Sequence, residues 1–142
     1  MADRTVLVTG AAKRLGREIA LHFANQGWNV IIHYGQSAQE AQAVVDEMHG
    51  LGVKAIALQA NLSRQAEAQS LIEKSINQFS RIDCLVNSAA IFEYDRPSQD
   101  DHLVSADLIE RHAQINLVAP VVMAQALFRH LKSQPISKAF VP

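Results

Sequence analysis

Cysteine, proline and glycine are scarce in this sequence, and no uninterrupted hydrophobic run reaches the length of a membrane span. The only cysteine, Cys84, cannot form an internal disulfide, which favours a reducing compartment and a buried, inert thiol. The N-terminal residues lack the charged and then apolar plan of a signal peptide. We therefore expect a cytoplasmic protein that has no membrane partner.

An excess of one charge is also lacking, because 13 Lys and Arg stand against 14 Asp and Glu, a net charge of −1. Without a basic stripe, nucleic-acid binding is disfavoured. The scattered histidines show no metal-ligand spacing, so we expect no metal site. What is present is 142 residues, 49% of them hydrophobic, which suffice for one globular domain over residues 1–142.

The stretch from residue 5 to residue 20 organises the rest of the chain. Thr5 to Thr9 is β-branched and apolar, which predicts a buried strand, and Gly10 allows the sharp turn that ends it. Gly16 falls in the first helical turns, where the missing side chain lets helix and strand approach closely. The free N–H groups of this helix start, with Lys13 and Arg14 beside them, predict an anion site suited to a phosphate-bearing dinucleotide.

This glycine turn matches no standard phosphate-binding motif in full. Arg14 stands where G-x-G-x-x-G has its middle glycine, and Leu15 stands where the Walker pattern needs its second glycine. An ordinary strand-to-helix turn with surface cations therefore stays open as an alternative. Leu15, Ile19 and Phe23 repeat every four residues, and we expect this apolar stripe to face the core.

Hydrophobic patterning predicts three further strands, at residues 29–34, 53–60 and 82–87, each separated from the next by a helix. Ser37 and Glu40 fit a capping box for the second helix, and Ser63 is the expected N-cap of the third. A long helix over about 106–132 contains Pro120, which we expect to kink it. The alternation predicts an α/β fold, a Rossmann-type parallel sheet with helices on both faces and its ligand beyond the carboxyl ends of the strands.

The end of the second strand bears on the choice of cofactor. Enzymes that prefer NAD usually carry an Asp or Glu there for the ribose 2′-hydroxyl. This chain has His33 and Tyr34 and no carboxylate until Glu40. A 2′-phosphate would meet no repulsion and could reach Ser37 and Arg14, so we expect NADP(H) to be preferred over NAD(H). The alternative is that His33 and Tyr34 merely finish a strand.

Three ordered motifs resemble the short-chain dehydrogenase/reductase family. They are Thr9-Gly10-x-x-x-Arg14-x-Gly16, Asn87-Ser88-Ala89-Ala90 and Asn116-Leu117-x-Ala119-Pro120. Within the family, Arg14 and the pair His33-Tyr34 are most similar to the pteridine reductase branch. The resemblance implies an oxidoreductase that reduces a carbonyl or a pterin-like C=N or C=C bond of a small molecule. It also implies a homo-oligomer, which is usual in the family.

The resemblance implies roles for residues at all four strand ends. The residues implied to bind the cofactor are Gly10, Lys13, Arg14, Leu15, Gly16, His33, Tyr34, Ser37, Asn61, Leu62, Asn87, Ser88, Ala89 and Ala90. The glycine turn would line the pyrophosphate and adenosine, and residues 33–37 would lie near the 2′-phosphate. Asn61 and Leu62 would meet the adenine, although Asn61 replaces the family's usual Asp. Asn87 would steady the sheet, residues 87–90 would line the nicotinamide ribose, and Asn116 would hold a water of the proton relay.

The family's catalytic Ser and its Tyr-x-x-x-Lys pair are absent from this sequence. Tyr34 and Tyr94 are followed four residues later by Ala38 and Ser98. We therefore expect a cofactor-binding first half, truncated before or within a fifth strand that could start at Lys138. The loop around Tyr94 would border the substrate.

Two functions stay open for the chain as written. One is the cofactor-binding part of an NADP(H)-dependent reductase, and the other is a non-catalytic dinucleotide-binding or interaction module. The lack of the proton donor predicts that this chain alone is inactive. In either case the strand over residues 82–87 would lack a neighbour, and the long helix would lose cover. Such an exposed apolar edge favours self-association.

Overall fold

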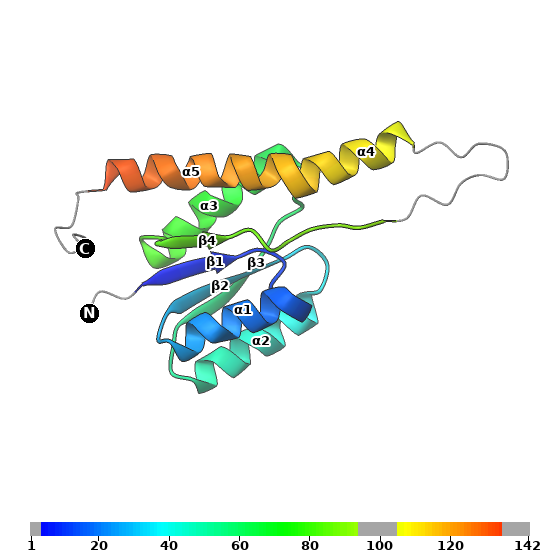
Figure 1. Cartoon of the computed structure of the whole chain (residues 1–142). Coiled ribbons are helices and arrows are strands. Elements are labelled where there is room, and N and C mark those ends of the chain that lie inside the picture. The colour runs from blue at the N-terminus through cyan, green and yellow to red at the C-terminus, as the bar shows by residue number, and fades with distance from the viewer. Residues whose placement is uncertain (1–3, 94–104, 135–142) are drawn as a thin grey trace.

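The computed structural model describes residues 4–93 and 105–134, and within them it contains one parallel sheet (Figure 1). The strands are β1 (Thr5–Val8), β2 (Asn29–Tyr34), β3 (Ala55–Gln59) and β4 (Cys84–Val86). They lie in the order β3-β2-β1-β4, with Val6 opposite both Val30 and Cys84. The first and central strand therefore has a crossover on each side, as the expected Rossmann-type fold requires.

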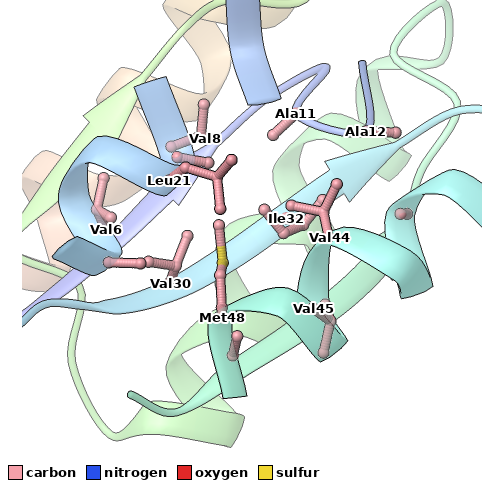
Figure 2. Close-up of a cluster of buried hydrophobic side chains, with 14 residues drawn as sticks. Val6, Val8, Ala11, Ala12, Leu21, Val30, Ile32, Val44, Val45 and Met48 are labelled. Carbon is pink, nitrogen blue, oxygen red and sulfur yellow. The ribbon is translucent and has the colours of Figure 1, made fainter. Parts of the chain in front are cut away.

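Helices cover both faces of this sheet (Figure 1). Strand residues alternate between two cores, because successive side chains of a strand point to opposite faces. Val6, Val8, Val30 and Ile32 pack with α1 (Arg14–Asn25) and α2 (Ala38–Gly50), as Figure 2 shows. On the other face, Leu7 and Ile31 pack with α3 (Gln65–Phe79) and α5 (Ala119–Ser133). The predicted α/β fold with helices on both faces is confirmed.

The expected inward stripe of α1 is wrong at Leu15, whose side chain is 70% exposed. The helix begins at Arg14, so Leu15 lies in its first turn, where it lines the cleft instead of the core. The buried residues of α1 are instead Leu21 and three small residues four positions apart, Gly16, Ala20 and Ala24. Their size lets α1 lie close to β1 and β2, while Ile19 and Phe23 pack beside them, partly buried.

The two predicted helix caps are wrong in detail. Ser37 is the N-cap of α2, but its side chain makes no capping hydrogen bond, and Glu40 forms an ion pair with Lys13 at 2.7 Å instead. The N-cap of α3 is Arg64 rather than Ser63. The Ser63 hydroxyl and N–H both donate to Asn61 Oδ1, at 2.7 and 3.0 Å, and this local turn takes the serine away from the helix start.

The predicted long helix is interrupted before Pro120 rather than at it. α4 (Ala106–Ala113) passes into a π-helical turn over Gln114–Val118, and α5 follows. The Ala119 N–H donates to the Gln114 carbonyl, five residues earlier. Pro120 has no N–H to give to the Asn116 carbonyl, so the ordinary hydrogen-bond ladder cannot pass through this turn.

The strand β4 lies at one edge of the sheet in the described part of the chain. Cys84 on this strand is half-buried rather than fully buried, and burial raises the pKa of its thiol, as suits an unreactive cysteine. Large apolar side chains are exposed along α4, the π-helical turn and α5, namely Ile109, Leu117, Val121, Phe128 and Leu131. The expected fifth strand after Lys138 and the loop around Tyr94 lie outside the described residues. No described helix combines the length and apolar character needed to cross a membrane.

Candidate functional site: a cleft at the carboxyl ends of the strands

A cleft of about 1150 Å³ lies beyond the carboxyl ends of the four strands. The predicted cofactor-binding residues that line it are Gly10, Lys13, Arg14, Leu15, Gly16, His33, Asn61, Leu62, Ser88, Ala89 and Ala90. Tyr34, Ser37 and Asn87 do not line it. The cleft has the volume and the open form of a site for a large, elongated small molecule.

Glycine is required at both ends of the first turn. Gly10 has a φ of +62°, and a Cβ there would lie 2.9 Å from the Ala89 Cα. A Cβ on Gly16 would lie 2.3 Å from the Gly10 carbonyl oxygen, closer than any side chain tolerates. The absence of these two Cβ atoms therefore lets β1, α1 and the segment after β4 meet around one cradle. This is the backbone approach that a pyrophosphate site needs.

The N-terminus of α1 is open to an anion. Its N-cap, Lys13, makes no capping hydrogen bond with its side chain, and the first turn contains no acidic residue. Arg14 has a φ of 54°, so a non-glycine residue takes the left-handed conformation at the position where the dinucleotide motif has glycine. The Arg14 side chain is exposed and has no carboxylate partner within residues 4–93 and 105–134. Arg14 is therefore available to an anionic ligand, whereas Lys13 is paired with Glu40.

The Thr9 hydroxyl ties the glycine turn to the segment after β4. It accepts hydrogen bonds from the Ser88 and Ala89 N–H groups, both at 3.0 Å, and faces the Val86 carbonyl at 3.4 Å. Asn87, expected to steady the sheet, is exposed and makes no side-chain hydrogen bond in the described structure. Sequence analysis missed this role of Thr9, although its place directly before Gly10 in the first motif was a signal for it.

His33 lines the cleft, and its place near a 2′-phosphate stays a prediction. Its ring is buried, with Nδ1 accepting from the Gly10 N–H at 3.1 Å and Nε2 at 3.0 Å from the Ala60 carbonyl. The His33 backbone carbonyl accepts from the Ala11 N–H at 3.0 Å. Burial lowers the pKa of His33, and the hydrogen bond to Ala60 opposes this in part. The residue connects the ends of β1, β2 and β3.

The outer wall of the cleft near β2 differs from the prediction. Tyr34 is half-buried against the core under α1 and α2, and Ser37 is the N-cap of α2 and does not line the cleft. Gly35 and Gln36 take their place in the lining, and the Gly35 carbonyl accepts from the Gln59 side chain at 2.9 Å. The sequence gives little signal for this, because strand alternation alone does not fix which loop residue turns toward the ligand.

The wall formed after β3 contains Asn61, but its side chain is already in use. Asn61 Oδ1 accepts from Ser63, and the Asn61 N–H donates to the Glu67 carboxylate at 2.7 Å. That hydrogen bond lowers the pKa of Glu67, and Arg64 contributes further. Leu62 beside it is buried and lines the cleft. Of the expected pair, Leu62 is therefore the residue that contributes apolar surface to the lining, and its contact with an adenine stays a prediction.

Asn116 closes the far end of the cleft through the backbone of Ile91. Its Oδ1 accepts from the Ile91 N–H and its Nδ2 donates to the Ile91 carbonyl, both at 2.9 Å. These two hydrogen bonds hold the segment after β4, and the amide keeps one N–H and one lone pair for a further partner. Beside it, His112 Nε2 accepts from the Glu93 N–H at 3.1 Å, and Arg111 pairs with the Glu93 carboxylate at 2.6 Å.

A family model described as short chain dehydrogenase matches residues 4–138, which is nearly the whole sequence. This chain belongs to the short-chain dehydrogenase/reductase family. The cleft described above lies at the family's expected position, at the end of β1 where the strand order reverses. Among the described residues, no three His, Cys, Asp or Glu side chains are grouped as a metal site requires.

Three similar proteins illustrate the relation. The 3-oxoacyl-(acyl-carrier-protein) reductase FabG of Staphylococcus epidermidis is 42% identical over 89 residues, covering 63% of this chain and 36% of that protein. A short chain dehydrogenase from Burkholderia cenocepacia in complex with NADP matches at TM-score 0.80 and 36% identity, covering 89% of this chain and 50% of that one. FolM alternative dihydrofolate reductase 1 from Brucella canis, complexed with NADP, matches at TM-score 0.81 and 30% identity, covering 95% and 50%. The match thus spans half or less of each of these proteins.

Proposed function

We propose that this chain is the cofactor-binding part of an NADP(H)-dependent reductase. The observation that supports this most is the cradle between Gly10 and Gly16. The two missing Cβ atoms leave space for a pyrophosphate, and the uncapped N-terminus of α1 offers free N–H groups and a positive dipole end to its negative charge. Two similar proteins, from Burkholderia cenocepacia and Brucella canis, are described in complex with NADP. When bound, the cofactor supplies a hydride to the substrate.

Different residues of the cleft would bind different parts of the cofactor. The N–H groups at the start of α1 and the Arg14 guanidinium would hold the phosphates, while Leu62 would cover the adenine. Ser88, Ala89 and Ala90 would line the nicotinamide ribose, held in place by Thr9. Asn116 would keep the substrate end of the cleft in shape through Ile91. A water-holding role for Asn116 stays a prediction.

The preference for NADP(H) over NAD(H) is proposed from the end of β2. Gly35 and Gln36 line the cleft there, and the first carboxylate after them, Glu40, is paired with Lys13. A 2′-phosphate therefore meets no free negative charge and lies within reach of Arg14 in this proposal. Replacing Arg14 by Ala and titrating both reduced cofactors tests it. We expect NADPH binding to weaken about tenfold or more and NADH binding to change less. Equal weakening would show that Arg14 does not recognise the 2′-phosphate.

The proposed substrate is a small molecule with a carbonyl or a pterin-like C=N or C=C bond. Support for the pteridine reductase branch comes from Arg14 with His33 and Tyr34, and from the relative named as an alternative dihydrofolate reductase. The relative named 3-oxoacyl-(acyl-carrier-protein) reductase supports a carbonyl substrate instead. Reading the coding frame beyond Pro142 for Ser and Tyr-x-x-x-Lys, and then comparing pterins with ketones under NADPH, would decide between them.

A non-catalytic dinucleotide-binding or interaction module remains the second candidate. Its support is the exposure of large apolar side chains, Leu117 on the π-helical turn and Phe128 on α5. This surface also carries the proposal that the chain self-associates. Sedimentation of the chain should show a concentration-dependent oligomer that Phe128→Lys weakens. A monomer that melts cooperatively would count against it. A cytoplasmic location is likewise a proposal that rests on the sequence.

A further inference from the structure

The two hydrogen bonds of the His33 ring fix its protonation state. The Ala60 carbonyl can only accept, so Nε2 must carry a hydrogen, and the Gly10 N–H can only donate, so Nδ1 must be bare. Both bonds exist together only in the neutral ring with its proton on Nε2. The ring is 3% exposed, so water cannot replace either partner without moving the backbone.

Two further close approaches restrain the position of Gly10. A Cβ on it would touch the Ala89 backbone, and its carbonyl oxygen lies against Gly16. The Ala11 N–H donates to the His33 carbonyl, so the turn keeps one backbone tie to β2 even without the ring. Loss of the ring's bond would therefore leave the fold intact and free only the orientation of the Gly10 peptide, which borders the phosphate cradle.

We propose that His33 is a positioning residue for the cofactor: its neutral ring orients the Gly10 peptide, and protonation of the ring lowers dinucleotide affinity. This inference rests on the proposed binding of a dinucleotide in the cleft. His33 acts through Gly10 in this account and recognises no phosphate itself. A doubly protonated ring would point an N–H at the Gly10 N–H, two donors facing one another, and the turn would have to shift.

No carboxylate hydrogen-bonds to the His33 ring in the described structure. The titratable and charged residues on the elements around His33 are Lys13 and Arg14 of the turn, Arg17, Glu18 and His22 of α1, Tyr34 of β2, Glu40, Asp46, Glu47 and His49 of α2, Glu67, Glu73 and Lys74 of α3, and Cys84 of β4. Both hydrogen bonds of the ring go to backbone atoms rather than to any of these carboxylates. Glu40 pairs with Lys13, and Glu67 with Arg64.

Two variants separate positioning from structure. In His33→Asn the amide oxygen replaces Nδ1 as the acceptor for Gly10 but cannot titrate, whereas His33→Leu fills similar space and deletes both bonds. Binding of NADP⁺ and NAD⁺ is measured by calorimetry from pH 5 to pH 8. NAD⁺ serves as the control for the titration of the 2′-phosphate, whose second pKa is about 6. Thermal unfolding of each variant is followed in parallel.

We expect wild-type affinity for both dinucleotides to fall at acidic pH, and this shared fall to be absent in His33→Asn. At neutral pH, His33→Leu should bind about tenfold more weakly, as loss of one buried hydrogen bond implies, while His33→Asn stays within about threefold of wild type. A merely structural His33 would lower stability in both variants and leave the pH profile of binding unchanged. That result would overturn the inference. If His33→Leu fails to fold, the comparison of the pH dependence of binding between wild type and His33→Asn still tests the inference.

A readout without cofactor separates this inference from the proposed function. Nitrogen NMR of the free chain should show the Nε2-protonated tautomer, and the Gly10 amide signal should titrate together with the His33 ring. A different tautomer, or a Gly10 signal independent of the ring, would refute the inference even if dinucleotides bind. Failure of the wild type to bind either dinucleotide, with this coupling intact, would instead refute the proposed function and with it the role of His33 toward a cofactor.

Discussion

Arg14 offers a sharp test because it combines a strained backbone with an exposed charge. Its φ of 54° lies in the left-handed region, at the first residue of α1. We compare Arg14→Gly with Arg14→Ala, since both remove the guanidinium and differ only at the backbone. In an ordinary helix interior Ala is more stable than Gly by about 1 kcal/mol. At this position the order should reverse.

The size of the reversal follows from two opposing effects. A non-glycine residue in the left-handed region costs about 1–2 kcal/mol, which Gly avoids and Ala does not. Gly also lowers the free energy of unfolding by about 0.5–1 kcal/mol, because the unfolded chain has more conformational freedom with Gly than with Ala. Arg14→Gly should therefore exceed Arg14→Ala in unfolding free energy by about 0.5–1 kcal/mol, which corresponds to a melting temperature about 1–4 °C higher.

Urea denaturation of both variants measures the stability difference, and cofactor titration supplies the second readout. The two variants should bind NADPH about equally weakly, because both lack the Arg14 charge. If Arg14→Ala is the more stable of the two, the left-handed conformation at residue 14 is wrong. If either variant binds NADPH as tightly as wild type, Arg14 has no part in phosphate binding.

Three further predictions concern the same cleft. Gly16→Ala should destabilise the chain by about 1–3 kcal/mol in urea denaturation, because its Cβ would lie 2.3 Å from the Gly10 carbonyl oxygen, and a neutral outcome would refute the tight contact. Glu40→Gln should free Lys13 and raise NADPH affinity by up to about fivefold with NADH unchanged, and calorimetry that finds no gain would show that Lys13 lies out of reach. Because burial lowers the folded-state pKa of His33, its contribution to stability is complete above the unfolded value of about 6.5 and is lost as the pH falls through the folded value. Urea midpoints of wild type should therefore decline more steeply below pH 6.5 than those of His33→Asn, and parallel curves would contradict this.

The sequence predicted the features that follow from local backbone chemistry. The glycine turn and the parallel sheet with helices on both faces follow from the placement of glycine and from the alternation of strands with helices along the chain. Leu15 was misplaced because periodicity along a helix does not reveal where the helix starts relative to the sheet. Leu15 lies in the first turn of α1, where it lines the cleft instead of the core.

Side-chain roles at the site were harder to predict because they depend on partners distant in sequence. His33 bonds to Gly10 and Ala60, and no local pattern distinguishes a strand-end histidine that meets a ligand from one that holds backbone. Asn116 likewise engages Ile91, 25 residues earlier. These residues hold the backbone of the cleft in place through hydrogen bonds to Gly10, Ala60 and Ile91. The sequence motifs therefore predicted that they lie near the site, but not what their side chains bind.

The central claim is that this chain binds NADP(H) in the cleft beyond its strands. Calorimetric titration of the purified chain with NADPH, and separately with NADH, tests it most directly. We expect saturable binding of one NADPH per chain, with NADH at least about tenfold weaker. Absence of binding to either cofactor would contradict the proposed function, and equal affinity for both would contradict the preference for the 2′-phosphate.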